Sequence, residues 1–124
     1  MIRRRLSRAV VAAIDASKIL GVRAGARSTH RFIGVWPVVV EGRVFVRSWA
    51  RKLDGWYHTF LTDSAGAIQI GSRTIRIRAV PTRSTRIRDA IERAYAARYG
   101  ATQKFVRGFR SKRRRDTTLE LVPR

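Results

Sequence analysis

The chain has 124 residues, with 28 lysines and arginines against 8 acids, a formal net charge of +20 and no cysteine. This length predicts a single domain, residues 1–124, with its own hydrophobic core. The lack of cysteine excludes disulfides, thiolate metal sites and a catalytic cysteine. No apolar run approaches the ~20 residues of a membrane-spanning helix, and the basic N-terminus does not read as a secretory signal. We therefore expect a cytoplasmic protein with no membrane partner.

The high positive charge has two competing explanations. A polyanionic partner, such as nucleic acid, a membrane surface or a phosphorylated ligand, is the functional one. The other is genomic base composition, because the chain holds 24 arginines but only 4 lysines, beside 15 alanines, and most arginine and alanine codons are GC-rich. Since the arginines are spread along the whole chain, the sequence leaves both explanations open.

The N-terminal part of the chain predicts a basic tail followed by a helix. Residues 1–6 read as a flexible basic tail. From Ser7 to Ser17, apolar side chains recur at spacings of three and four, so they share one face of a helix. Ser7 is a residue type that caps the N-terminus of a helix, because its hydroxyl accepts a hydrogen bond from a free backbone N–H.

The segment that follows predicts extended structure interrupted by a loop. Lys18–Arg23 reads as a short strand, and the small residues of Ala24–Ser28 read as a turn or loop. Thr29–Val40 is a longer extended run. Pro37 within this run lacks a backbone N–H, which predicts an edge position or a bulge. The consecutive valines at 38–40 predict that both faces of the strand are covered.

Two hairpins are predicted from glycine-containing turns. Glu41-Gly42 precedes the apolar run Arg43–Trp49, and glycine supplies the positive φ that a tight turn requires. The register of this hairpin stays open by one residue, because Gly42 also fits a bulge. Ala67–Val80 is the clearer hairpin, with Gly71-Ser72 as its two-residue loop.

The pairing in the second hairpin separates two kinds of side chain. With a two-residue loop, Ile70 faces Arg73 and Ile68 faces Ile75. The isoleucines then share one side of the ribbon. The other side carries the polar residues Gln69, Thr74, Arg76 and Arg78. This alternation predicts a half-buried antiparallel ribbon with an arginine-bearing outer face.

After Pro81 the period of the sequence changes to that of a helix. Apolar residues at spacings of three and four predict a helix over Thr85–Tyr99. Ser84 or Thr85 caps its start, and Gly100 stands where a helix commonly ends in a residue of positive φ. Residues 101–109 show no clear period.

The C-terminal segment predicts a loop and a last strand. Lys112–Arg115 is a run of charge that is typical of a loop. Thr117–Val122 alternates as a strand does, with leucines inward and with Thr118 and Glu120 outward. The predicted class is therefore α+β, mainly β with two helices. Five or six antiparallel strands in so short a chain favour a small closed or partly closed barrel, because closure removes exposed sheet edges.

The sequence supports hydrolytic catalysis poorly and leaves the catalytic residues unknown. It has no G-x-S-x-G, P-loop or G-x-G-x-x-G motif, and His30 and His58 are its only histidines. Two histidines and scattered acids do not readily supply the ligands of a zinc site, so we expect no metal.

A basic and aromatic stretch is the best candidate for a ligand site. Positively charged and hydroxyl side chains match the oxygens of a phosphate, and neighbouring aromatic rings can stack on a planar group. The candidate site residues are Arg47, Ser48, Trp49, Arg51, Lys52, Trp56 and Tyr57. The alternative is structural, with Trp56, Tyr57 and Phe60 packed in the core and the charges solvated.

Two alternative functions remain, a nucleic-acid binder and a non-catalytic interaction module. A sequence-nonspecific nucleic-acid binder would use the predicted arginine face and the basic run near the C-terminus. Those residues are Arg76, Arg78, Lys112, Arg113, Arg114 and Arg115. The other alternative is a non-catalytic interaction module.

Several of these segments resemble known families when read in order. Val44–Ser48, Trp56–Leu61 and Ile68–Ala79 resemble the deazaflavin-dependent nitroreductases, a branch of the FMN-binding split barrels. A closer resemblance, over nearly the whole chain, is to the bacterial family catalogued as domain of unknown function 2255. Segments that carry it include Asp89–Gly100 and Thr117–Arg124.

These resemblances imply a small antiparallel split β-barrel, FMN-binding split-barrel-like, that forms a homodimer. They also imply FMN or a deazaflavin coenzyme as cofactor, bound for a redox reaction. The chain departs from the nitroreductase pattern in three places, one of which is that no proline precedes Trp56. Residues 51–55 read Arg-Lys-Leu-Asp-Gly where those proteins carry a Gly-Gly phosphate loop, and Thr59 replaces an asparagine.

Overall fold

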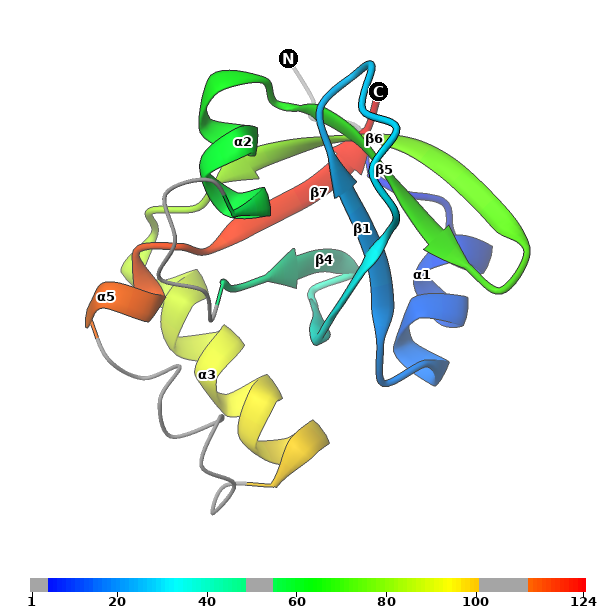
Figure 1. The fold of residues 1–124 in the computed structure, drawn as a ribbon. Coiled ribbons are helices and arrows are strands. Elements are labelled where there is room, and N and C mark those ends of the chain that lie inside the picture. The colour runs from blue at the N-terminus through cyan, green and yellow to red at the C-terminus, as the bar shows by residue number, and fades with distance from the viewer. Residues whose placement is uncertain (1–4, 49–54, 101–111) are drawn as a thin grey trace.

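A computed structural model of the chain describes residues 5–48, 55–100 and 112–124. It is built from one antiparallel sheet and several helices (Figure 1). In chain order the elements are α1 (Arg8–Ala16), β1 (Leu20–Ala24), β2 (Ile33–Val35), β3 (Pro37–Val40), β4 (Arg43–Val46), α2 (Trp56–Thr62), β5 (Ala65–Ile70), β6 (Arg73–Pro81), α3 (Thr85–Tyr99), α5 (Lys112–Arg115) and β7 (Leu119–Pro123). None of these helices combines the length and the apolar character needed to cross a membrane.

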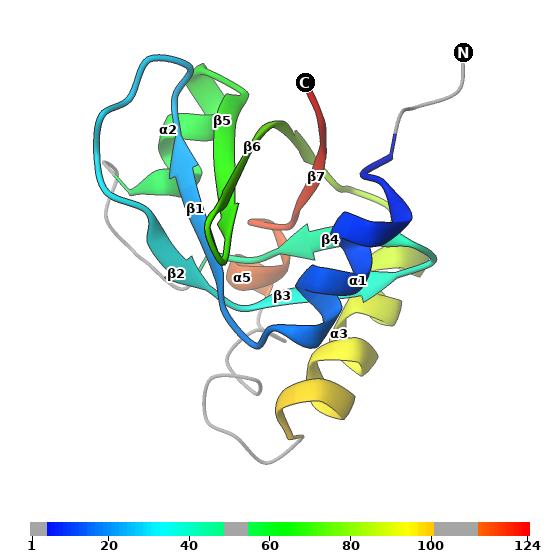
Figure 2. The ribbon, with the colours of Figure 1, turned by 90° about the vertical axis from the view of Figure 1, so that its right-hand side faces the viewer.

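The strand order explains why the sheet curls into a barrel. The seven strands run β2-β1-β5-β6-β7-β4-β3, and every pairing is antiparallel. The two edge strands, β2 and β3, are consecutive in sequence and separated only by Trp36. The sheet must therefore bend until its opposite edges meet, which gives a nearly closed barrel (Figure 2). This confirms the predicted α+β barrel, although the sheet has seven strands instead of the predicted five or six.

The junction between the two edge strands is held by aromatic residues of α3. The ring of Trp36 stacks on Tyr99 at a centroid distance of 4.3 Å. The Tyr95 hydroxyl donates to the Trp36 carbonyl at 2.7 Å, and the Tyr99 hydroxyl donates to the Pro37 carbonyl at 2.7 Å. The predicted extended run Thr29–Val40 is thus two strands, broken at Trp36, because this junction passes from one edge of the sheet to the other. Pro37 opens the edge strand β3, as its missing N–H predicted.

Both predicted hairpins form with two-residue turns. In the first, Val40 pairs with Arg43, and Glu41 and Gly42 have φ of 54° and 71°. Positive φ at both central residues is the turn that matches the right-handed twist of the flanking strands. This resolves the register that the sequence left open. In the second hairpin, Ile70 pairs with Arg73 and Ile68 with Ile75, as predicted.

The protein has two hydrophobic clusters, one on each face of the sheet. Inside the barrel, α1 contributes Val10 and Ile14, and α2 contributes Trp56 and Phe60. The second cluster lies between α3 and the outer face of β3 and β4 and consists of Val38, Phe45, Ile87, Ile91 and Tyr95. The helix α3 therefore covers one half of the outer face of the sheet (Figures 1 and 2).

The helices confirm some predictions and correct others. Ser7 and Ser84 cap α1 and α3, accepting hydrogen bonds from Val10 N–H and Ile87 N–H. The structure adds α2 and the short α5 to the two predicted helices. The run Lys112–Arg115, which was predicted to be a loop, forms the helix α5.

Strand β7 corrects a second prediction. Thr118 and Glu120, expected to point into solvent, each keep only 1% of their surface exposed. Strand β7 lies between β4 and β6, and its outer face lies in the half of the sheet next to α3. Arg43 binds the Glu120 side chain there with two hydrogen bonds, of 3.0 and 2.9 Å.

Candidate functional site

Arg47, the first residue of the predicted ligand site, lies inside the protein. It follows β4 directly, and only 2% of its surface is exposed. Its Nε donates to Thr118 Oγ1 at 2.8 Å, and its Nη2 donates to the Arg88 carbonyl at 3.1 Å. Arg47 therefore joins the end of β4 to the start of β7 and to α3.

The charge of Arg47 is part of an internal ionic cluster. Its Nη1 lies 3.7 Å from Glu92 Oε1, and Arg115 contacts both Glu92, at 2.9 Å, and Asp89, at 2.7 Å. Burial lowers the pKa of Arg47 to about 10, with Glu92 acting in the opposite direction. Arg47 is thus charged at neutral pH, and its guanidinium contacts residues of the same chain.

The next predicted site residues divide between the protein interior and a pocket. The Ser48 N–H donates to Thr117 Oγ1 at 2.9 Å, and Ser48 is buried. The half-buried Tyr57 donates from its hydroxyl to the Asp116 carbonyl at 3.1 Å. Trp56 packs edge-on against Phe60 and forms part of a pocket wall. The sequence predicts either a core position or a ligand-site position for Trp56. In the structure Trp56 belongs to the hydrophobic core and also lines the pocket.

The predicted residues Trp49, Arg51 and Lys52 lie outside the described residues. They stand in the chain between Ser48, at the end of the described part of the β4 segment, and Gly55, the cap of α2. Their proposed contribution to an anion site stays a prediction.

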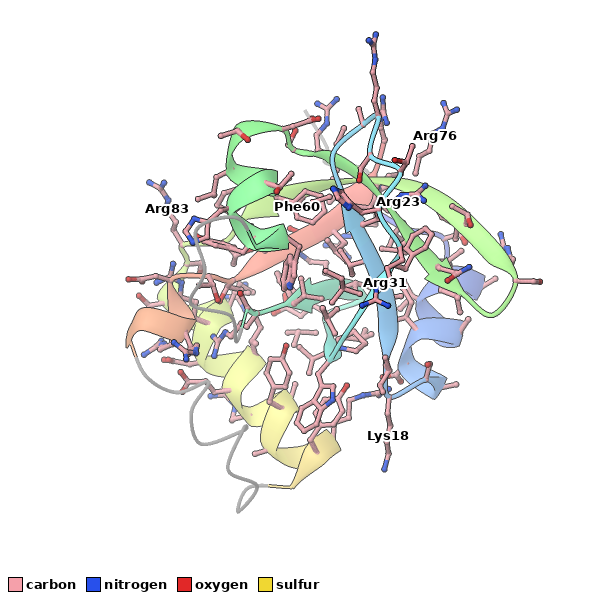
Figure 3. All side chains as sticks on the ribbon, in the orientation of Figure 1. Lys18, Arg23, Arg31, Phe60, Arg76 and Arg83 are labelled. Carbon is pink, nitrogen blue, oxygen red and sulfur yellow. The ribbon has the colours of Figure 1, made fainter. Side chains whose placement is uncertain are left out.

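A large open pocket lies where the β1–β2 connection meets α2. Its volume is about 650 Å³. Trp56 and Thr59 of α2 form one wall, and Val22 and Ile33 contribute apolar surface from the paired strands. The polar lining comes from β1 and the connection after it, and consists of Arg23, Arg27, Ser28, Thr29, His30 and Arg31. Figure 3 shows Arg23 and Arg31 on these two segments and Phe60 on the neighbouring helix.

The described charged side chains that line this pocket are all positive. Among the described residues that line it, three are arginines and none is acidic. The carboxylate of the nearby Asp63 does not line the pocket. It accepts hydrogen bonds from the backbone N–H groups of Ala26, at 2.9 Å, and Ala65, at 3.2 Å. These backbone hydrogen bonds lower the pKa of Asp63. They also tie the connecting loop to the start of β5, so the loop is held over the pocket.

Local contacts also order the basic side of the pocket. The guanidinium of Arg23 stacks over the ring of Phe32 at 4.5 Å, a cation–π contact. The His30 N–H donates to the Ser28 hydroxyl at 3.2 Å, which forms a small turn in the connection. Within the described parts of the chain, no group of three or more histidines and acids is placed to hold a metal ion. The pocket therefore offers cations, hydroxyls and one indole, a combination suited to an anionic ligand with a planar ring.

The arginines of this pocket were not predicted as site residues. The signal was present in residues 23–31, Arg-Ala-Gly-Ala-Arg-Ser-Thr-His-Arg, where three arginines, two hydroxyls and a histidine surround a glycine. Gly25 has a φ of 101°, so the chain turns there and brings the arginines around one space. Only the packing of this loop against α2 makes that space a pocket.

The alternative basic surface is divided by the structure. Arg76 and Arg78 are exposed on β6, as predicted. Arg114 is buried, with 7% of its surface exposed, and Arg115 is held in the ionic cluster with Asp89 and Glu92. Lys112 and Arg113 belong to α5 by their backbone. The predicted nucleic-acid surface thus does not form one continuous exposed patch with Arg114 and Arg115.

Comparison with known proteins gives one result. A search of curated proteins found no match. The model of a family described as uncharacterised proteins conserved in bacteria, DUF2255, matches residues 9–121. This match spans nearly the whole chain, from α1 into β7, and includes the pocket. The chain therefore belongs to the DUF2255 family.

Proposed function

We propose that the protein binds a phosphorylated, planar heteroaromatic cofactor of the flavin or deazaflavin type in the pocket between β1, the β1–β2 connection and α2. The observation that carries the proposal is the lining of this pocket. It combines Arg23, Arg27 and Arg31 with the indole of Trp56, and none of its lining residues is acidic. Its volume of about 650 Å³ lies within the range of small-molecule sites, roughly 300–1,000 Å³.

Each part of the lining has a role in this proposal. Guanidinium groups bind phosphate oxygens through paired, charge-assisted hydrogen bonds. The hydroxyls of Ser28 and Thr29 add neutral donors, and Trp56 and Ile33 offer apolar surface to a ring. Arg23 is held in place by Phe32, so one phosphate-binding group is ordered before the ligand arrives. Pre-ordering reduces the entropy lost on binding.

The redox chemistry would belong to the cofactor, which accepts and donates hydride. The chain would bind its phosphate, orient its ring and supply the surrounding charge. The resemblance of residues 44–48, 56–61 and 68–79 to the deazaflavin-dependent nitroreductases supports this cofactor class. The nearly closed antiparallel barrel is consistent with it.

A ligand titration tests the proposal. Purified protein is titrated with FMN and with a deazaflavin coenzyme, and ligand fluorescence is followed at ~150 mM salt, where the Debye length is about 8 Å and loose ionic binding is screened. We expect saturable binding of at least one of the two. Changing Arg27 and Arg31 to glutamine should weaken it by about tenfold or more, because each lost charge-assisted hydrogen bond contributes about 1.5–3 kcal/mol.

Two further variants make this experiment specific. Arg8→Gln/Arg93→Gln removes the same charge from two exposed helix positions and should leave affinity within about twofold. Arg51→Ala/Lys52→Ala tests the predicted contribution of the loop before α2. Absence of binding to both ligands, or an equal loss in the Arg27/Arg31 variant and its control, would contradict the proposal.

A further inference from the structure

The described arginines fall into two groups, those that form an ion pair with an acid and those that do not. The ion pairs of the described residues involve Arg43, Arg47, Arg86, Arg88, Arg98 and Arg115. All of these belong to β4 and the segment after it, to α3 or to α5. The exposed arginines of β6, Arg76 and Arg78, take part in none of the described ion pairs or hydrogen bonds. The positive charge is therefore uncompensated on one side of the barrel.

The strand register places Arg76 and Arg78 on the same surface as Arg23, whose guanidinium stacks over Phe32. Arg23 of β1 pairs with Ala67 of β5, which pairs in turn with Arg76 of β6, so the three form one row across the sheet. Arg78 lies two residues further along β6 and points to the same face, because side chains alternate along a strand. We call this surface, Arg23, Arg76 and Arg78 on the outer face of β1, β5 and β6, the arginine face.

On this surface, alanines of β5 lie between Arg23 of β1 and the two arginines of β6. Ala65 and Ala67 occupy the middle strand, and both are nearly covered, with 8% and 7% of their surface exposed. The arginine face is thus a shallow strip with small residues along its centre and guanidinium groups at its sides. Gln69 and Thr74, which pair across the next row, add exposed neutral polar groups. No acid belongs to β1, β5 or β6.

The two halves of the outer sheet face have different surroundings. The half formed by β3 and β4 packs against α3 and is apolar. The β5–β6 ribbon lies away from α3 (Figure 1), and its outer polar side chains are exposed. Figure 3 shows the side chain of Arg76 pointing away from the body of the protein. The structure therefore buries one half of this face and leaves the arginine half open to a partner.

We propose that the arginine face binds the phosphate backbone of a double-stranded nucleic acid without reading its sequence. Residues two apart on a strand lie about 6.8 Å apart, and strands two apart in a sheet lie about 9.6 Å apart. The Cα atoms of Arg76, Arg78 and Arg23 are therefore about 7–12 Å apart. The charges of a duplex strand advance by about 3.4 Å along the helix axis, so these three long side chains can reach different phosphates of one duplex.

Other polyanions fit this surface less well. Single-stranded nucleic acid is held mainly by bases stacked on aromatic rings, whereas the Phe32 ring next to this face is covered by the Arg23 guanidinium. A membrane-binding surface needs apolar anchors beside its charges. The large apolar residues that are exposed in the described chain, Ile19, Ile33 and Leu61, all lie outside β5 and β6.

Anisotropy measurements with a fluorescent duplex test this proposal. A labelled DNA duplex of about 20 base pairs and arbitrary sequence is titrated with the full-length protein between ~50 and ~200 mM salt. We expect binding that weakens with salt. In the Arg76→Gln/Arg78→Gln variant, the slope of log affinity against log salt should become shallower by about 1.8, since each phosphate contact contributes about 0.9. Arg23 is left unchanged because it also lines the ligand pocket.

A charge-matched variant separates this surface from general electrostatics. Arg86→Gln/Arg93→Gln removes two charges from exposed positions on α3, and its slope should match that of the unmodified protein. Circular dichroism of all variants confirms that they are folded. An equal effect of both variants, no duplex binding at ~50 mM salt, or preferred binding to anionic phospholipid vesicles would overturn the proposal. Cofactor binding by the Arg76/Arg78 variant, measured in parallel, reports on the pocket independently.

Discussion

A buried cation has to be compensated at the level of single atoms, and Arg47 shows how this chain does so. Removing a guanidinium from water is costly unless its donors are satisfied. Here Nε binds Thr118, Nη2 binds the Arg88 carbonyl and Nη1 faces Glu92. These contacts connect three segments that are distant in sequence. Arg47 is thus a structural residue that connects β4, β7 and α3.

Replacing Arg47 should reduce stability strongly. Arg47→Ala removes a fully enclosed side chain and leaves Thr118 and the Arg88 carbonyl without their donor. We expect the free energy of unfolding to fall by about 3–5 kcal/mol, as for other broken buried ionic contacts. Urea denaturation followed by circular dichroism measures this change. The exposed Arg93→Ala is the control and should stay within about 0.5 kcal/mol. A loss below about 1 kcal/mol in Arg47→Ala would show that its contacts contribute little.

At the scale of elements, α2 owes its position to a glycine on the neighbouring strand. Phe60 of α2 lies over Gly66 of β5, inside the barrel. A Cβ added at Gly66 would lie 2.4 Å from the Arg23 carbonyl oxygen and 2.7 Å from the Phe60 ring. Both contacts are far inside van der Waals distance, and the first is with the backbone of the paired strand β1. The absence of a side chain at this position allows both the strand pairing and the packing of α2.

The substitution Gly66→Ala should therefore loosen α2. We expect a loss of about 1–3 kcal/mol in the free energy of unfolding, typical of overpacking, together with a change in the fluorescence of Trp56, which lies on the same helix. Gly34→Ala on β2 is a matched control, because its Cβ would meet only the Ile19 side chain, at 2.9 Å, and Ile19 is 59% exposed. Similar losses in both variants would contradict this explanation of the packing.

The elements also show where local sequence patterns are sufficient. The cap Ser7 and the turn Gly71-Ser72 were predicted, and Ser84 was one of two predicted caps, because each depends on contacts within a few residues. The helix at Lys112–Arg115 was not predicted. Its Arg115 is paired with Asp89 and Glu92 on α3, more than twenty residues earlier in the chain, so the run looks like a loop when read alone.

At the scale of the whole molecule, burial of the tyrosines links stability to alkaline pH. Burial raises the pKa of Tyr57, Tyr95 and Tyr99 above the ordinary value for a phenol. These are all the tyrosines of the chain. Above pH ~10 the unfolded chain loses these protons while the folded protein keeps them, so the folded state binds more protons. The free energy of unfolding must then decrease as the pH rises.

We expect this loss to begin near pH ~10 and to continue as the pH rises through the raised pKa values. Arg47 opposes it, because its pKa is lowered to about 10 on folding, but it is one group against three. Urea unfolding from about pH 8 to pH 11, with tyrosinate absorbance recorded in parallel, measures both quantities. Phenol ionisation in the native protein at the same pH as in the denatured chain would contradict the predicted linkage.

The candidate site illustrates what can be predicted from sequence and what cannot. Trp56 was expected near a ligand and lines the pocket, while Arg47 and Ser48 turn their polar groups toward β7 and α3. The arginines of residues 23–31 became site candidates only because the β1–β2 connection packs against α2, some thirty residues later. Pairings of this kind are long-range, and periodicity within a segment carries no information about them.

By itself, the sequence determined the class of the fold, the caps and turns, the Ile-lined ribbon with arginine outside, and membership of the DUF2255 family. These follow from side-chain period and backbone preference, which act over a few residues, or from motif order along the chain. The tertiary structure decided that Thr118 and Glu120 are buried, that Arg47 is internal and that Arg23, Arg76 and Arg78 share the outer face of the sheet formed by β1, β5 and β6. Each of these depends on which element covers which face of the sheet, and α3 sets that by packing on only one half of it.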